Sequence, residues 1–114
     1  MPATQPPGPP GPARHEIPTV DAAALDAARH ADRLLAAARE RGQRRWVDFL
    51  APVPDALRDG ALKELRSVAL KARAAYGPKD SIRDVLPDDL TEPFRESIDR
   101  LLKALARHEV NAQS

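Results

Sequence analysis

The positions of the twelve prolines constrain what this chain of 114 residues can fold into. Proline has no backbone N–H donor and disfavours helical backbone in the residue before it, so it marks the ends of helices. Seven prolines fall within residues 1–18, and the other five stand at positions 52, 54, 78, 87 and 93. The prolines therefore separate an N-terminal arm from three segments that are long enough to form helices.

Residues 1–18 are predicted to be a disordered, proline-rich arm. The stretch has too few apolar residues to form a packed core, and the charges of Arg14 and Glu16 cancel. Its glycine triplets, at Gly8 and Gly11, are too few for a collagen-like triple helix, which needs glycine at every third residue over a long run. The arm is either a ligand for a proline-recognition groove or a tail without a partner.

One apolar stripe predicts a long first helix over residues 21–50, with Asp21 as its N-cap. Steps of three and four residues along the stripe are those of a single helix face. The stripe consists of Ala24, Ala28, Ala31, Leu35, Ala38, Gly42, Trp46 and Phe49. Because the stripe continues through Gly42, we expect one helix, straight or kinked at that glycine. The alternative is that Gly42 ends the helix, as glycine often does after a basic last turn.

A second apolar stripe predicts a helix over residues 54–76. Its members recur every three or four residues: Leu57, Ala61, Leu65, Val68, Ala72 and Tyr76. Gly60 lies inside this range, where glycine costs about 1 kcal/mol relative to alanine. A break at Asp59–Gly60 is therefore the alternative to one continuous helix. Gly77 and Pro78 end the helix.

The rest of the chain predicts a short connector helix and a last helix. Ser81 and Asp84 resemble a capping box, which favours a helix over residues 81–86. The last helix is predicted over residues 92–109, with Thr91 as its cap. It carries the clearest apolar stripe of the chain, formed by Phe94, Ile98, Leu101, Leu102 and Leu105.

No strand pattern and no internal repeat accompany these helices. The predicted fold is all-α: a small bundle of three main helices plus a short connector helix, with the disordered proline-rich arm at the N-terminus. We expect the bundle to form one domain over residues 19–110 and residues 111–114 to be a frayed tail.

Composition and charge argue against several classes of protein. Lysine and arginine number 18 and aspartate and glutamate 17, for a net charge of +1, whereas a general polyanion binder is strongly basic. The chain has no cysteine, which excludes disulfides and thiolate chemistry and fits a cytoplasmic location. No apolar stretch approaches the roughly 20 residues of a membrane span. The N-terminus also lacks the apolar region of a secretory signal.

The sequence offers few candidates for catalysis, and we expect no enzymatic activity, no cofactor and no metal site. His30 follows Asp26 by four residues, so both can share a helix face, but no third metal ligand is evident. No serine lies in the turn motif of a hydrolase nucleophile. The remaining hypothesis of an enzyme or ligand binder places Asp26 and His30 in a site formed only at a dimer interface.

The stripe on the first helix is the best candidate for a contact surface. At the standard rise the helix would be roughly 45 Å long and would overhang the others. Small residues let helices approach closely, and large aromatic residues are frequent interface anchors. The predicted interface residues are Leu35, Ala38, Gly42, Trp46 and Phe49. We therefore expect a non-enzymatic interaction or regulatory protein that self-associates as a homo-oligomer through its first helix or binds another protein.

Four arginines border this stripe and support the alternative function, an accessory nucleic-acid-binding protein that contacts phosphates. They are Arg39, Arg41, Arg44 and Arg45. Trp46 argues against this alternative because its place on the apolar stripe keeps it from stacking on bases.

The same arginines could contact an acidic partner. Segment 39–45 has four arginines and one glutamate (net +3), and segment 78–92 has two basic and five acidic residues (net −3). The two segments are expected to pair, within one chain or between chains.

Overall fold

The computed structural model describes residues 13–113, and within this range every regular element is helical. The all-α prediction is confirmed. Residues 1–12, which make up most of the predicted arm, and residue 114 lie outside the described residues. The elements in chain order are η1 (Arg14–Glu16), α1 (Pro18–Glu40), α2 (Arg44–Leu50), α3 (Val53–Asp59), α4 (Leu62–Ala74), η2 (Ile82–Asp84) and α5 (Asp88–Gln113).

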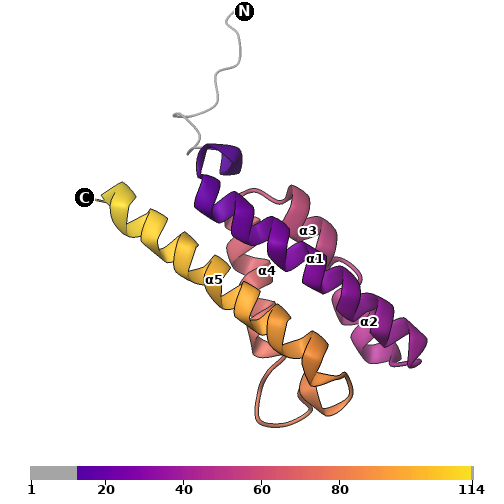
Figure 1. Ribbon diagram of the computed structural model, residues 1–114. Coiled ribbons are helices and arrows are strands. Elements are labelled where there is room, and N and C mark those ends of the chain that lie inside the picture. The colour runs from indigo at the N-terminus through magenta and orange to yellow at the C-terminus, as the bar shows by residue number, and fades with distance from the viewer. Residues whose placement is uncertain (1–12, 114) are drawn as a thin grey trace, which may run out of the picture.

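Helices α1 and α5 form the central pair of the bundle. They lie side by side and run in opposite directions, while α3 and α4 cover the other side of the molecule (Figure 1). Helix α1 also packs against α3 and α2, and α4 packs against α5. Helix α1 is therefore in contact with almost every other helix of the described chain.

The core combines six alanines of α1 with large side chains from all five α-helices. The predicted stripe of the last helix is confirmed, since Phe94, Ile98 and Leu101 are fully buried. Fully burying a Leu, Ile or Phe side chain contributes roughly 1.5–3 kcal/mol each. The hydroxyl of the buried Ser97 donates to the carbonyl of Phe94 at 2.7 Å, so this polar group is satisfied within the core. The buried alanines of α1 are Ala24, Ala27, Ala28, Ala31, Ala37 and Ala38.

The prediction of one helix over residues 21–50 is wrong, because Gly42 ends the first helix. Gly42 has a positive φ of 63°, a left-handed conformation in which glycine alone carries no steric penalty. Its N–H donates to the carbonyl of Arg39 at 3.2 Å, and the N–H of Gln43 donates to the carbonyl of Ala38 at 2.9 Å. These two bonds form a Schellman motif, which satisfies the last carbonyls of α1. Helix α2 then starts in a new direction.

The second predicted helix, over residues 54–76, is also divided, as the alternative break at Asp59–Gly60 anticipated. Gly60 has extended backbone (φ −68°, ψ 145°) between α3 and α4. A Cβ atom added there would lie 2.4 Å from the carbonyl oxygen of Ala56. Only glycine therefore fits this corner without a shift of the backbone.

The connector is close to its prediction, whereas the last helix is longer than predicted. Ser81 and Asp84 form the expected capping box of η2, which covers only Ile82–Asp84 rather than 81–86. Helix α5 begins at Asp88 instead of residue 92, so Thr91 lies within it and is not its cap. The helix runs to Gln113, so residues 111–113 are helical instead of a frayed tail.

Arg14 shows that the end of the predicted arm belongs to the folded domain. Its side chain is only 11% exposed, and its Nε donates to Oδ1 of Asp21 at 2.8 Å. Its Nη1 donates to the carbonyl of Leu57 at 2.7 Å and to that of Gly60 at 3.0 Å. Arg14 thereby satisfies carbonyls at the C-terminal end of α3, which have no partner within their own helix. The boundary of the arm at residue 18 is therefore too late.

We predict that Gly60→Ala lowers the free energy of unfolding by about 1–3 kcal/mol, because the new methyl group is forced against a backbone oxygen. Denaturant unfolding followed by the fluorescence of Trp46 measures this change. Gly77→Ala is the matched control, since a Cβ at position 77 meets its nearest atom at an ordinary 3.6 Å. Its effect should stay within about 0.5 kcal/mol. Equal effects of the two substitutions would show that the corner at Gly60 is not tightly packed.

Candidate functional site

Most of the predicted interface residues are used inside the fold. Ala38 is fully buried, Leu35 is 8% exposed and Trp46 is 5% exposed, so their side chains contact the chain's own core. Gly42 is exposed in the turn after α1, and nothing lies within 4 Å of the position its Cβ would take. Phe49 is half-buried and packs edge-to-face on Trp46, with ring centroids 5.5 Å apart. Of this set, only Phe49 presents a large apolar side chain to solvent.

Phe49 lies in a groove between the α2–α3 segment and α4. A pocket of about 410 Å³ opens there, and a second pocket of about 400 Å³ continues it toward the connector. The two pockets share Phe49 and Lys71 and are therefore neighbours, and we refer to them together as the α4 groove. The first is lined by Phe49, Pro52, Val53, Ala56, Glu64, Ser67, Val68 and Lys71. The second is lined by Arg45, Trp46, Phe49, Lys71, Ala74, Ala75, Lys79 and Asp80.

The surface of α4 next to the groove carries one large apolar side chain that is exposed to solvent. Leu70 is 54% exposed, although leucine gains by burial. It lies three residues after Ser67 and four before Ala74, so the three share one face of the helix. Ser67 and Ala74 line the groove. Leu70 therefore extends the apolar surface from the groove onto the outer face of α4.

Three cations surround the end of the groove nearest the connector. Arg45, Lys71 and Lys79 line this end together with one carboxylate, Asp80. None of the three forms an ion pair with any residue between 13 and 112. The guanidinium of Arg45 lies over the ring of Trp46, 4.9 Å from its centroid, and this contact fixes its position. The groove thus combines an apolar floor with positive charge at one end.

The four arginines at the junction of α1 and α2 are all exposed. Arg44 pairs with Asp48 at 3.7 Å, an exposed contact worth under about 1 kcal/mol. Within the described chain no ion pair joins segment 39–45 to segment 78–92, so the predicted pairing inside one chain is not formed. Arg83 of the connector pairs instead with Glu92 at 2.8 Å.

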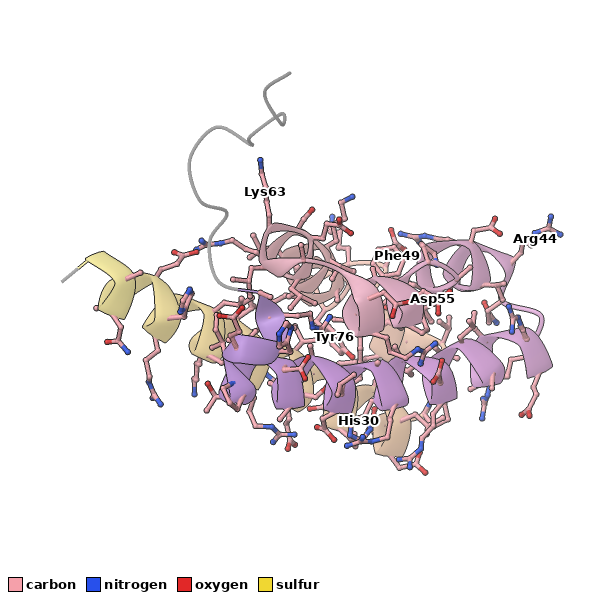
Figure 2. The ribbon with its side chains drawn as sticks, turned by 90° about the horizontal axis from the view of Figure 1, so that it is seen from above. His30, Arg44, Phe49, Asp55, Lys63 and Tyr76 are labelled. Atoms are coloured by element: carbon pink, nitrogen blue, oxygen red, sulfur yellow. The ribbon has the colours of Figure 1, made fainter. Side chains whose placement is uncertain are left out.

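The residues labelled in Figure 2 lie on different sides of the molecule. Phe49 and Lys63 lie toward one side, and His30 lies toward the opposite side, on α1 (Figure 2). The α4 groove and the Asp26–His30 pair are therefore separate features.

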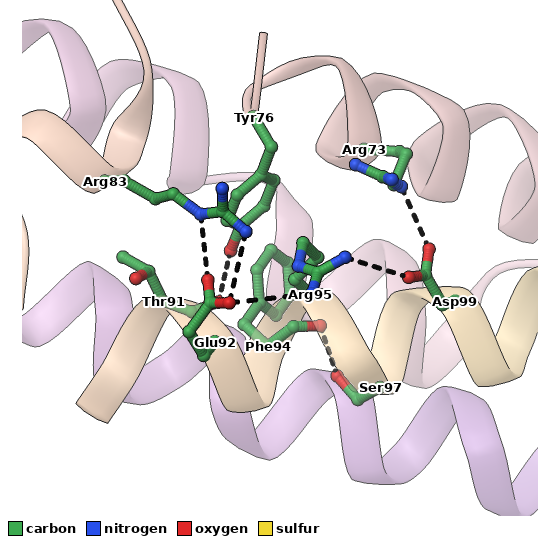
Figure 3. Close-up of polar contacts among 9 residues, drawn as sticks. All are labelled: Arg73, Tyr76, Arg83, Thr91, Glu92, Phe94, Arg95, Ser97 and Asp99. Carbon is green, nitrogen blue, oxygen red and sulfur yellow. Dashed lines mark hydrogen bonds and ion pairs between the residues drawn. The ribbon is translucent and has the colours of Figure 1, made fainter. Parts of the chain in front are cut away.

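A polar network that the sequence did not reveal holds the connector on α5 (Figure 3). Tyr76 donates from its hydroxyl to the carbonyl of Thr91 at 2.6 Å, and burial raises the pKa of this phenol, so it stays a neutral donor. Arg95 lies between Glu92 and Asp99, at 3.5 and 3.6 Å. Because these side chains pair with residues of the same chain, we assign the network a structural role. No local motif could have predicted it, since Tyr76 and Thr91 are 15 residues apart.

The predicted Asp26–His30 pair forms, with Nε2 of His30 3.8 Å from Oδ1 of Asp26. Arg29 and Arg100 also donate to this carboxylate, at 3.1 and 3.2 Å, so Asp26 links α1 to α5. Burial alone would raise the pKa of Asp26, but the bond from Arg100 and the nearby His30 and Arg29 outweigh it and hold the pKa below 3.8. No group of three or more potential ligands in the described residues is arranged to hold a metal ion.

Comparison with known proteins identifies no relative of this chain. The chain matches no protein family, no curated protein and no solved structure. In the part of the chain that the structure describes, no helix is both long enough and apolar enough to cross a membrane.

We predict that Asp26→Asn lowers stability at neutral pH by under about 1 kcal/mol, since the carboxylate is partly exposed. A carboxyl group whose pKa is lowered by folding stabilises the protein above its ordinary pKa and loses this effect as the pH falls. The difference between wild type and variant should therefore shrink as the pH falls below about 3.8. Thermal melts between neutral pH and pH about 2.5 measure it.

Asp48→Asn is the control for this prediction, because Asp48 is 71% exposed and pairs along its own helix only. It should change stability less at neutral pH. A difference for Asp26→Asn that stays constant over the whole pH range would contradict the assigned role of the carboxylate.

Proposed function

We propose that this chain is a non-enzymatic interaction protein whose α4 groove binds a helical segment of another polypeptide chain. The observation that carries the proposal is the apolar trough beside α4, which contains a half-exposed phenylalanine and is flanked by an exposed leucine. A groove between two helices can accommodate the apolar face of a third helix.

The lining of the groove supports binding rather than catalysis. Ser67 is the only hydroxyl side chain that lines either pocket, and no histidine lines them. Glu64 and Lys71 line the same pocket one helical turn from Ser67, but among the described residues neither forms a hydrogen bond with its hydroxyl, which an activated nucleophile would need. The nearest cations, Lys71 and Arg45, can attract a charged partner without any chemical step.

The predicted self-association stays part of the proposal, but through a surface other than the first helix. The stripe on α1 is occupied by α3 and α5, so a second copy would have to contact the groove and Leu70 instead. The chain contains no cysteine, which is consistent with the cytoplasmic location that we propose for it.

Nucleic-acid binding is the second candidate function, and the exposed arginine cluster favours it. Arg39, Arg41 and Arg44 lie near one turn at the end of α1 and could contact phosphates. Trp46 cannot stack on bases in this structure, because it is buried and Arg45 covers it. A retarded band with duplex DNA that disappears as salt rises would support this candidate over the first.

We predict that Ser67→Tyr, which fills the groove from an exposed position, weakens binding of helical peptides by at least about tenfold. The probes are peptides of about 18 residues, selected on the wild-type chain from a displayed library with an apolar stripe. Fluorescence anisotropy measures their affinity. Ala106→Tyr, an equally bulky change at an exposed position of α5, is the control and should leave binding unchanged. Equal losses for both variants, or for neither, would contradict the assignment of the groove.

A further inference from the structure

Building on the proposed function, we propose that the segment bound in the α4 groove is an acidic amphipathic helix. Its apolar face would contact Phe49 and Val68, and carboxylates on its flank would face Arg45, Lys71 and Lys79. The partner is thus defined by chemistry: an apolar stripe with Asp or Glu beside it, supplied by a different protein.

The distribution of charge along the groove supports an acidic partner. Arg45 and Lys79 lie at one end with a single acidic residue, Asp80, and Lys71 lines both pockets where they meet. These three cations have no ion-pair partner among residues 13–112 and are free to bind carboxylates. Glu64 lines the other end, where a carboxylate of the partner would be repelled. The acidic residues of the partner are therefore expected near the end of the groove that faces the connector, which gives the bound helix a preferred direction.

The length of the groove sets the length of the partner. Helix α4 forms one wall and has 13 residues, so it is about 20 Å long at 1.5 Å per residue. A partner helix of about the same length covers this wall in three to four turns. Three or four apolar residues at helical spacing on the partner are enough to contact Phe49, Val68 and Leu70.

The arrangement of charges and helices disfavours a second copy as the occupant. Two grooves placed face to face in parallel would bring Arg45, Lys71 and Lys79 of one chain near the same cations of the other. In the antiparallel arrangement these cations would face a single carboxylate, Glu64. The apolar stripes of α1 and α5 are already buried in their own core, so neither helix can offer an apolar face to another chain while it stays folded. Among the described residues, the large apolar side chains that a second copy leaves exposed are Leu25, Leu70 and Val110. They lie on three different helices and form no apolar stripe, so we assign the bound helix to a different protein.

Two displayed libraries of helical peptides test this inference. Both carry the same randomised apolar stripe, but the flanking positions hold Glu and Ser in one library and Lys and Ser in the other. The Glu-flanked library should yield binders that Ser67→Tyr weakens at least about tenfold, and the Lys-flanked library should yield none. Raising the salt from about 50 to 500 mM should weaken the Glu-flanked binders, because exposed charges are screened.

Charge reversal on the protein provides the matched control. Lys71→Glu combined with Lys79→Glu should abolish binding of the Glu-flanked peptides and permit the Lys-flanked ones. Lys103→Glu combined with Arg107→Glu makes the same change of charge at exposed positions on α5 and should leave binding unchanged. Circular dichroism of each variant confirms that it is folded.

Three outcomes would overturn the inference, and they can be told apart. If the Lys-flanked library yields groove-dependent binders as often as the Glu-flanked one, the acidic partner is refuted and the proposed function is left intact. A dimer in sedimentation experiments that Ser67→Tyr dissociates would identify a second copy as the occupant. Absence of any groove-dependent binder from both libraries would refute the proposed function as well.

Discussion

The close packing of α5 against the alanines of α1 is the contact on which the rest of the structure depends. Alanine has a small side chain, so the backbones of two helices can approach closely where alanines lie between them. Phe94, Ile98 and Leu101 of α5 are fully buried, as are Val20 and Leu34 of α1. Because α1 has buried alanines on more than one face, it also accommodates α3. The apolar face of the first helix is consequently covered by its own chain.

This arrangement leaves α4 as the helix with a free apolar side. Two glycines produce it: Gly42 turns the chain from α1 into α2, and Gly60 turns it from α3 into α4. The turn at Gly60 is held further by Arg14, which donates to the carbonyl of Gly60. The α2–α3 segment and α4 then stand apart, and the gap between them is the groove that contains Phe49. A single straight helix over residues 54–76 would have offered no such trough.

The sequence predicted the fold class, the capping box at Ser81 and the buried stripe of α5, because each depends on residues close together in the chain. It favoured the wrong choice at Gly42 and Gly60. A spacing of three and four residues cannot distinguish one helix from two that pack on the same core, since both halves keep their apolar residues in phase. The backbone hydrogen bonds at Gly42 end the first helix, and the spacing of apolar residues in the sequence does not reveal such bonds.

The groove itself could be predicted only in part. Phe49 and Arg45 are among the predicted contact residues, and Val68 belongs to the predicted apolar stripe of residues 54–76. Lys71 and Lys79 follow no motif, and the five residues come together only when α2 and α4 are placed in space. Arg14 was assigned to the arm because its partners are 43 and 46 residues away. Likewise, the burial of Trp46 under Arg45 depends on the turn at Gly42, which redirects α2 against the core.

The most direct test of the central claim is a map of amide chemical-shift changes when a Glu-flanked helical peptide is added to the isotope-labelled chain. The account predicts that the largest changes fall on α2, α3 and α4, around Phe49, Val68 and Lys71, while the face formed by α1 and α5 around Asp26 changes little. Changes concentrated on α1 and α5, with the groove unaffected, would contradict it.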